Sequence, residues 1–99
     1  EAMKIASMAA AVDAGIQIHV CGSPIAIAAS LHVEASLPNF VIHEHHVTNR
    51  NEKNKRLGIY DHQPDKQGFC HIPELPGIGQ ELSAWAMEHA LAKDTIKGE

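Results

Sequence analysis

The sequence is short of the residues that mark several common classes of protein. It has two cysteines, and its eight basic residues are outnumbered by twelve acidic ones. Cys21 and Cys70 form no CxxC motif, which argues against a redox or zinc-ribbon motif, and two thiols are too few for a secreted disulfide framework. A reducing, cytoplasmic compartment is therefore expected. The net charge of −4 has the wrong sign for binding a phosphate backbone, so we expect no nucleic-acid partner.

Long hydrophobic runs are also missing. The longest weakly polar stretch, residues 24–33, is far shorter than the roughly 20 apolar residues that a membrane span needs. We therefore expect no membrane partner. The hydrophobic share of 44% is nevertheless that of a globular chain, and 99 residues suffice for one compact unit at most.

Hydrophobic periodicity predicts alternating helices and strands in the first 46 residues. In order, a helix, a strand, a helix and a strand are expected over residues 1–14, 16–20, 25–37 and 40–44. Gly15 stands where a left-handed C-cap ends the first helix, and Ser23 with Pro24 begins the second. A crossover helix of this length implies that the two strands are parallel, so the predicted fold class is α/β.

The second part of the chain, residues 47–99, is expected to be a loop followed by a C-terminal tail. The polar composition of residues 45–67 predicts a long loop, with a short edge strand near residues 57–60. A short strand, a turn-rich connector and a last helix are expected to follow over residues 69–72, 73–79 and 81–93. Two parallel strands protect neither both faces nor both edges of a sheet, so we expect a C-terminal piece of a larger α/β protein.

Two ionisable side chains end the predicted strands. His19 lies on the face opposite the aliphatic residues of its strand, and Glu44, which shares a face with Ile42, ends the next strand. The carboxyl ends of parallel strands carry the chemistry of α/β barrels, which makes both residues candidates for catalysis. The alternatives are a buried, hydrogen-bonded His19 and a solvated Glu44. Cys21 could be a nucleophile paired with His19, but a small, partly buried side chain before a helix is the favoured interpretation.

Histidine is the one residue type in clear excess. There are eight, and four of them fall within twenty positions: His43, His45, His46 and His62. The string of residues 43–46 suggests a metal site, but alternation puts two of its ligands on each face of the strand, which argues against one shared ion. A non-enzymatic, His-rich metal-binding or interaction module remains the alternative to an enzyme.

Several of these features together resemble a known family. His19, the loop Cys21-Gly22-Ser23-Pro24, the Ala-rich helix, Pro38-Asn39-Phe40 and Glu44 resemble the last two barrel strands of the mandelate racemase branch of the enolase superfamily. Its galactonate-dehydratase-like members are the most similar, and the loop after His19 is similar to that of 3,6-anhydro-L-galactonate cycloisomerases. The resemblance implies the C-terminal fragment of a (β/α)7β TIM-like barrel, with its last two strands and a C-terminal capping segment, over residues 1–99.

The resemblance also implies an activity. It is Mg²⁺-dependent abstraction of the proton α to the carboxylate of a sugar acid, giving an enediolate that collapses by cycloisomerisation or dehydration. His19 would be the acid/base, Glu44 would hydrogen-bond the region where charge develops, and both would bind substrate together with Cys21. The Mg²⁺ ligands are expected outside these residues, so the 99-residue chain alone should be inactive.

The implied partners are the small-molecule sugar-acid substrate, the remainder of the same barrel and further copies in a homo-oligomer. A further possibility is a superfamily member that keeps the fold and His19 but lacks the metal carboxylates and is catalytically silent.

Overall fold

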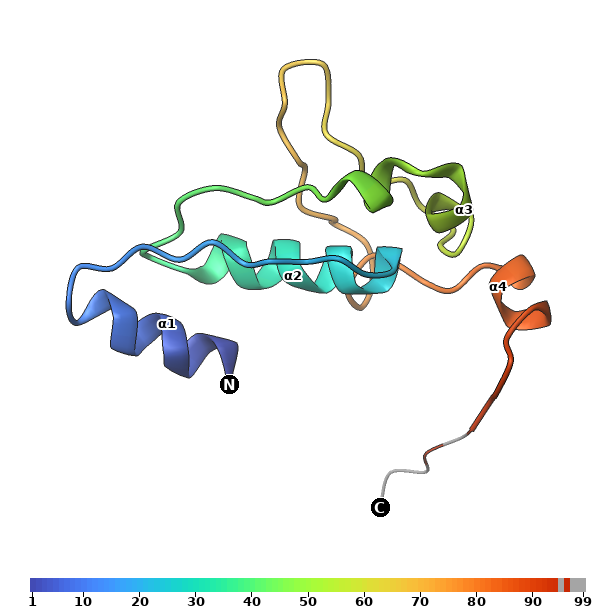
Figure 1. Cartoon of the computed structure of the whole chain (residues 1–99), viewed down its shortest axis with the longest axis horizontal. Coiled ribbons are helices and arrows are strands. Elements are labelled where there is room, and N and C mark those ends of the chain that lie inside the picture. Colours follow the sequence, from blue (N-terminus) through green and yellow to red (C-terminus); the bar gives the residue numbers. More distant parts are fainter. Residues whose placement is uncertain (95, 97–99) are drawn as a thin grey trace.

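A computed structural model of the protein describes residues 1–94 and residue 96. Its regular elements in chain order are α1 (Ala2–Ala10), α2 (Pro24–Ser36), the 3-10 helix η1 (Val47–Arg50), α3 (Glu52–Lys55) and α4 (Ala84–Glu88). Residues 16–20 form a first extended segment and residues 40–46 a second one. The two segments run in the same direction along α2, which returns the chain between them (Figure 1).

The two extended segments pair only where they begin. One parallel bridge joins Ile16 and Phe40, with the Ile16 amide donating to the Asn39 carbonyl at 2.8 Å and the Val41 amide to the Ile16 carbonyl at 3.0 Å. The parallel direction agrees with the sequence analysis, but the continuous strands predicted over residues 16–20 and 40–44 are wrong. Across the described residues no further backbone hydrogen bond links these two segments.

Helix α1 ends earlier than predicted. The chain leaves it through a Schellman turn, in which Asp13 donates to the Ala10 carbonyl and Ala14 to the Ala9 carbonyl. Asp13 takes the left-handed conformation of this turn, with φ of 55°, so the predicted role of Gly15 as C-cap is wrong. Gly15 instead allows the two extended segments to approach each other, because a Cβ there would collide with the Val41 side chain.

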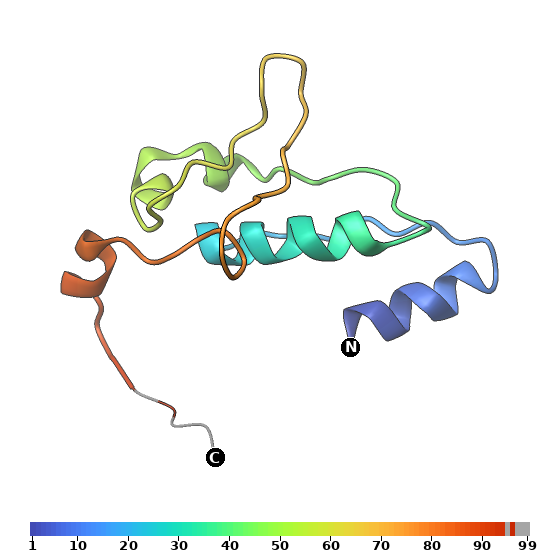
Figure 2. The same cartoon turned by 180° about the vertical axis from the view of Figure 1, so that it is seen from behind.

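Helix α2 forms the core with the first extended segment. It begins at Pro24 after Ser23, as predicted to within one residue, and ends before Pro38, where Leu37 turns extended. Its buried residues Ile27 and Leu31 pack against Val20, and Ile18 and Cys70 complete the cluster. The helix lies behind the first extended segment in Figure 1 and in front of it in Figure 2, so it covers one face of that segment.

The second half of the chain is held by buried amides more than by regular structure. Asn49 is 1% exposed and Gln80 is 6% exposed. The Gln80 side chain accepts from the amides of Ile59 and Tyr60 and donates to the Tyr60 carbonyl. This amide fixes residues 57–60 beside residues 80–82 without a continuous strand.

Several predictions for this half are therefore corrected. The expected edge strand over residues 57–60 is a single antiparallel bridge between Gly58 and Leu82, and the loop before it contains η1 and α3. Residues 69–72 are irregular, and the last helix spans Ala84–Glu88 instead of residues 81–93. Alternation and spacing overestimated these elements because their apolar side chains find little to pack on.

The molecule is more open than a complete domain of its size. Its radius of gyration is 15.1 Å, whereas about 13 Å is usual for 100 residues. Val41, Ile42 and Phe69 are among the large apolar residues that it exposes. No helix in the described part of the chain has the length and hydrophobicity needed to cross a membrane.

Candidate active site

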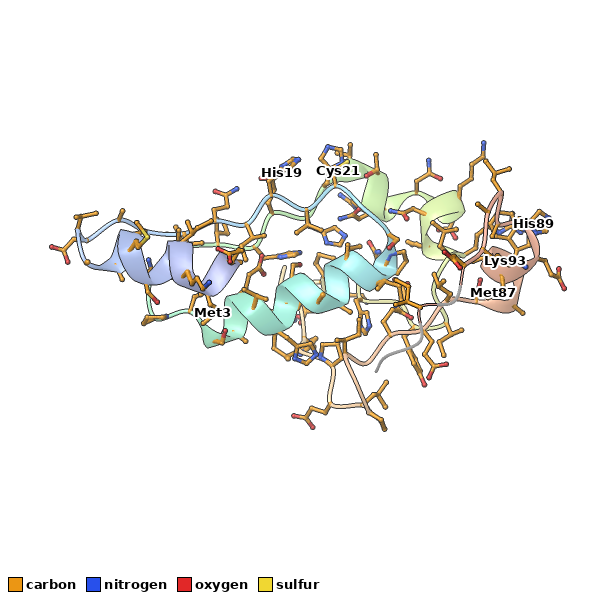
Figure 3. The ribbon with its side chains drawn as sticks, turned by 90° about the horizontal axis from the view of Figure 1, so that it is seen from below. Met3, His19, Cys21, Met87, His89 and Lys93 are labelled. Atoms are coloured by element: carbon orange, nitrogen blue, oxygen red, sulfur yellow. The ribbon has the colours of Figure 1, made fainter. Side chains whose placement is uncertain are left out.

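Alternation along the two extended segments gathers polar side chains on the side away from α2. Figure 3 shows His19 and Cys21 projecting on that side. We call six residues the polar face, since hydrogen bonds and a ring contact between His19 and His46 link them: Gln17, His19, Cys21, Glu44, His46 and Thr48. Gln17, His19 and Cys21 are spaced by two residues, the repeat of an extended chain, as are Glu44 and His46, and Thr48 follows in η1.

His19 and Glu44 form the central pair of the polar face. His19 Nδ1 lies 2.5 Å from Glu44 Oε1, and Gln17 Nε2 donates to Glu44 Oε2 at 3.1 Å. Because the Glu44 carboxylate is an acceptor, the proton of a neutral His19 ring lies on Nδ1. The other ring nitrogen, Nε2, then carries the lone pair. The His19 side chain is 66% exposed and that of Glu44 31% exposed, so both are open to a ligand and His19 is not the buried histidine considered above.

Cys21 contacts His46 and Thr48 of the polar face and not His19. Its Sγ lies 3.5 Å from His46 Nδ1 and 3.6 Å from Thr48 Oγ1. His46 is itself the N-cap of η1, because its Nδ1 accepts from the Thr48 amide at 3.2 Å. Cys21 is exposed, so the expected partly buried side chain is wrong: the residue lies on the polar face instead of in the core.

Buried asparagine anchors the end of the polar face. Asn49 donates from Nδ2 to the Val20 carbonyl at 3.3 Å, and Asn54 donates to the Gly22 carbonyl at 2.9 Å and to Asn49 Oδ1 at 3.2 Å. These bonds join η1 and α3 to the loop that follows His19. Residues that were predicted to lie in a long polar loop thus hold the backbone beside the catalytic candidates.

A second cluster lies on the other side of the same segment, toward α2. His43 Nδ1 lies 2.8 Å from Glu34 Oε2 on α2, and His45 Nδ1 lies 3.4 Å from His43 Nε2. Ligand atoms of His43, His45 and Cys70 all lie within 4.8 Å of one another. We call Glu34, His43, His45 and Cys70 the helix-side cluster.

Burial changes the acid–base properties of the helix-side cluster. Desolvation lowers the pKa of His45, and the Gln63 side chain that accepts from its Nε2 at 3.0 Å opposes this shift. Burial likewise raises the pKa of the Cys70 thiol, with the nearby charges of Glu34 and Asp65 adding to the effect. The neutral forms of both residues are therefore favoured.

Alternation in the sequence predicted only part of this cluster. Alternation correctly placed His43 and His45 on one face and Glu44 and His46 on the other. Alternation could not predict that Glu34 and Cys70 lie beside these histidines. Their positions depend on how α2 and the loop before residue 70 pack against the second extended segment. His62, for which no role was predicted, has its Nε2 2.9 Å from the carbonyl oxygen of Gly79.

The donors of the polar face do not suit Mg²⁺, the ion that the resemblance implies. Mg²⁺ prefers several oxygen ligands in octahedral geometry. Glu44 is the one carboxylate of the polar face, and both of its oxygens are engaged by Gln17 and His19. In the described residues, the one group of possible metal ligands that lies close enough is nitrogen- and sulfur-based. We therefore assign no Mg²⁺ ligand to this chain.

The comparison with protein families is decisive. Residues 1–86 match the model of the enolase C-terminal domain-like family. The chain belongs to this family. Its two extended segments, with α2 between them and one parallel bridge joining them, lie within the matched residues.

Solved structures extend this enolase-family assignment. A member of the enolase superfamily from Salmonella Typhimurium is 48% identical with a TM-score of 0.83, over 90% of this chain and 22% of that one. A candidate dehydratase from Zymomonas mobilis is 42% identical with a TM-score of 0.84, over 89% and 22% of the two chains. A search of curated proteins found no match.

A third solved structure is that of an enolase of the mandelate racemase subgroup from Agrobacterium tumefaciens. It is 30% identical with a TM-score of 0.74, over 89% of this chain and 24% of that one. The chain therefore spans about a quarter or less of the length of each of these relatives. Together with a candidate isomerase from Sinorhizobium meliloti, 32% identical with a TM-score of 0.75 over 87% of this chain and 23% of that one, they indicate an enzyme family of dehydratase and isomerase type.

Proposed function

We propose that the protein removes the proton α to the carboxylate of a sugar acid, with His19 as the acid/base. The enediolate would collapse by dehydration, as in galactonate dehydratases, or by cycloisomerisation, as in 3,6-anhydro-L-galactonate cycloisomerases. Any Mg²⁺ would be held by residues outside this chain, and no step proposed here passes through it. The remainder of a barrel and further copies in a homo-oligomer are the proposed protein partners.

The contact between His19 Nδ1 and Glu44 Oε1 at 2.5 Å carries the proposal. A carboxylate on Nδ1 orients the imidazole, selects its tautomer and stabilises the imidazolium that forms when Nε2 takes a proton. Histidine is the side chain that most often serves as a general acid and base in enzymes. The exposure of His19 leaves Nε2 within reach of a substrate.

Glu44 has two proposed tasks. Its Oε1 positions His19, as just described. Its Oε2 is held only by the side-chain amide of Gln17, which is itself exposed, so a substrate could take the place of Gln17 there. Hydrogen bonds to the region where charge develops strengthen in the transition state, which makes such a contact productive. Cys21 is proposed to contact the substrate from the neighbouring position on the polar face.

Turnover of sugar acids by the full-length protein tests the proposal. D-galactonate and 3,6-anhydro-L-galactonate are the first substrates to assay, in the presence of Mg²⁺. His19→Asn should lower kcat by ~10² to 10⁴, the usual contribution of an acid/base group. Glu44→Gln should lower kcat more than it raises KM, because its hydrogen bonds matter most as charge develops.

His32→Asn is the matched control. This histidine lies on α2, where its Nε2 is 3.2 Å from the Ile78 carbonyl oxygen, away from the polar face. Its replacement should leave kcat within a small factor of the parent value. If His19→Asn retained parental turnover of a sugar acid that the protein accepts, His19 would not be the acid/base.

A further inference from the structure

The helix-side cluster has a geometry that the proposed function does not use. It lies between α2, which carries Glu34, and the second extended segment, whereas His19 and Glu44 are on the opposite side of the two extended segments. Glu34, His43, His45 and Cys70 also line one cavity of about 410 Å³, together with apolar residues. A cavity with several convergent ligand atoms is a place where an ion or small ligand can bind.

Hydrogen bonds leave two nitrogen lone pairs facing each other in this cavity. The Glu34 carboxylate accepts from His43 Nδ1 at 2.8 Å, so the neutral His43 ring carries its lone pair on Nε2. Gln63 Nε2 donates to the Asn49 carbonyl, which turns its Oε1 toward His45 Nε2 at 3.0 Å. His45 then carries its lone pair on Nδ1, which lies 3.4 Å from His43 Nε2.

The spacing of these two nitrogens is that of ligands on one ion. Nitrogens at about 2.0–2.1 Å from a tetrahedral Zn²⁺ lie about 3.4 Å apart. Cys70 Sγ adds a third ligand atom, within 4.8 Å of a ring nitrogen of each histidine. Imidazole and thiolate are donors that select Zn²⁺ over Mg²⁺ or Ca²⁺.

Buried charge gives a second, independent reason to expect a cation. Glu34 is 3% exposed, and its Oε1 is buried with no hydrogen-bond partner. The described residues that line the cavity include no lysine or arginine. A dication would balance the Glu34 carboxylate and a Cys70 thiolate, and histidine ligands commonly donate their second nitrogen to just such a carboxylate.

We propose that the chain binds Zn²⁺ through His43 Nε2, His45 Nδ1 and Cys70 Sγ, with Glu34 orienting His43. Water or another small ligand would take the fourth position in the cavity. The site goes beyond the proposed function and does not depend on it. The competing interpretation is a metal-free core, in which Cys70 only packs on Leu31 and one proton is shared between His43 and His45.

Zn²⁺ binding to the metal-stripped, full-length protein tests this site. Binding would be measured by competition with a chromogenic chelator, and Co²⁺ would serve as a spectroscopic probe of tetrahedral geometry and thiolate ligation. The parent should bind one Zn²⁺ that is lost in His45→Gln and Cys70→Ser. Glu34→Gln should weaken binding by ~10- to 100-fold, the usual effect of removing a carboxylate behind a ligating histidine.

Two controls separate this site from other metal-binding residues. His46→Gln alters the histidine next to His45 but on the polar face, and it should bind Zn²⁺ as the parent does. A thiol-protection experiment needs no variant: Zn²⁺ should shield Cys70 from alkylation and leave Cys21 reactive. Three results would overturn the proposal. They are a parent that binds no Zn²⁺, equal Zn²⁺ binding by the parent, His45→Gln and Cys70→Ser proteins, and alkylation of Cys70 as fast with Zn²⁺ as without it.

Discussion

The two sides of the second extended segment place the same residue types in different environments. On the polar face, Glu44 meets an exposed His19, and the pair is open to a ligand from outside. On the helix side, Glu34 meets His43 under the cover of α2, and one carboxylate oxygen is left without a partner. Two carboxylate–histidine pairs thus differ mainly in burial. Exposure suits the first to proton exchange with a substrate, whereas burial suits the second to holding an ion.

The largest expected effect is a loss of turnover in a polar-face variant that leaves Zn²⁺ binding by the helix-side cluster intact. His19→Asn should reduce turnover by ~10² to 10⁴ and leave Zn²⁺ affinity unchanged. Glu34→Gln should do the reverse, with Zn²⁺ affinity lowered by ~10- to 100-fold and kcat close to that of the parent. Turnover assays and Zn²⁺ titrations on the same preparations give both values. Parallel losses of both readouts in either variant would show that the two sides act as one site.

Asn49 is the residue whose loss should damage both sides together. Its side chain and carbonyl tie the first extended segment to η1 and to Gln63, which in turn orients His45. Asn49→Ala leaves buried polar groups unpaired, and we expect it to lower the free energy of unfolding by ~1–3 kcal/mol. Chemical denaturation measures this free energy. Asn51→Ala, at an exposed helix cap nearby, is a control that should leave turnover and Zn²⁺ affinity intact.

Asp13 is expected to have a smaller effect, on the turn that leads into the first extended segment. With φ of 55° it occupies a conformation that costs a non-glycine residue about 1 kcal/mol or more. Asp13→Gly should therefore raise the melting temperature, and Asp13→Val should lower it. The two variants should shift thermal unfolding in opposite directions, and equal shifts would mean that backbone conformation is not what matters there.

The smallest expected effect concerns the loop that carries Cys70. Asp65 Oδ1 accepts from the amides of Phe69 and Gln67, and the Phe69 bond, with lesser help from His71, lowers the pKa of Asp65 below 3.8. A lowered pKa means that the carboxylate stabilises the loop above pH 3.8 and that this contribution disappears as the pH falls through the lowered value. Amide hydrogen exchange of Phe69 in Asp65→Asn at neutral pH should be faster than in the parent, with Val20 unchanged.

Features that depend on local periodicity could be predicted from the sequence. Contacts between residues far apart in the chain could not. Helix α2 was located to within one residue because Ser23, Pro24 and Pro38 mark its ends. The alternation of residues 43–46 was also right, and it placed His43 with His45. The predicted strands were not found as such, since a strand needs neighbours that the described residues do not supply.

The missed parts of the two sites have a common cause. Cys70 approaches His45 from 25 positions away, and Glu34 reaches His43 across the turn after α2. Asn49 and Gln80 are polar residues in a loop, and nothing in their sequence context marks them as buried. Their burial follows from the backbone groups that they satisfy, which only the folded chain brings together.

The most direct test of the central claim is exchange of the substrate's α-proton with solvent. The full-length protein would be incubated with Mg²⁺ and an accepted sugar acid in deuterium oxide, and deuterium at the α-carbon of residual substrate and of product would be followed by NMR. The parent should catalyse incorporation, and His19→Asn should abolish it while His32→Asn retains it. Undiminished α-deuterium incorporation by His19→Asn would contradict the assignment of proton transfer to His19.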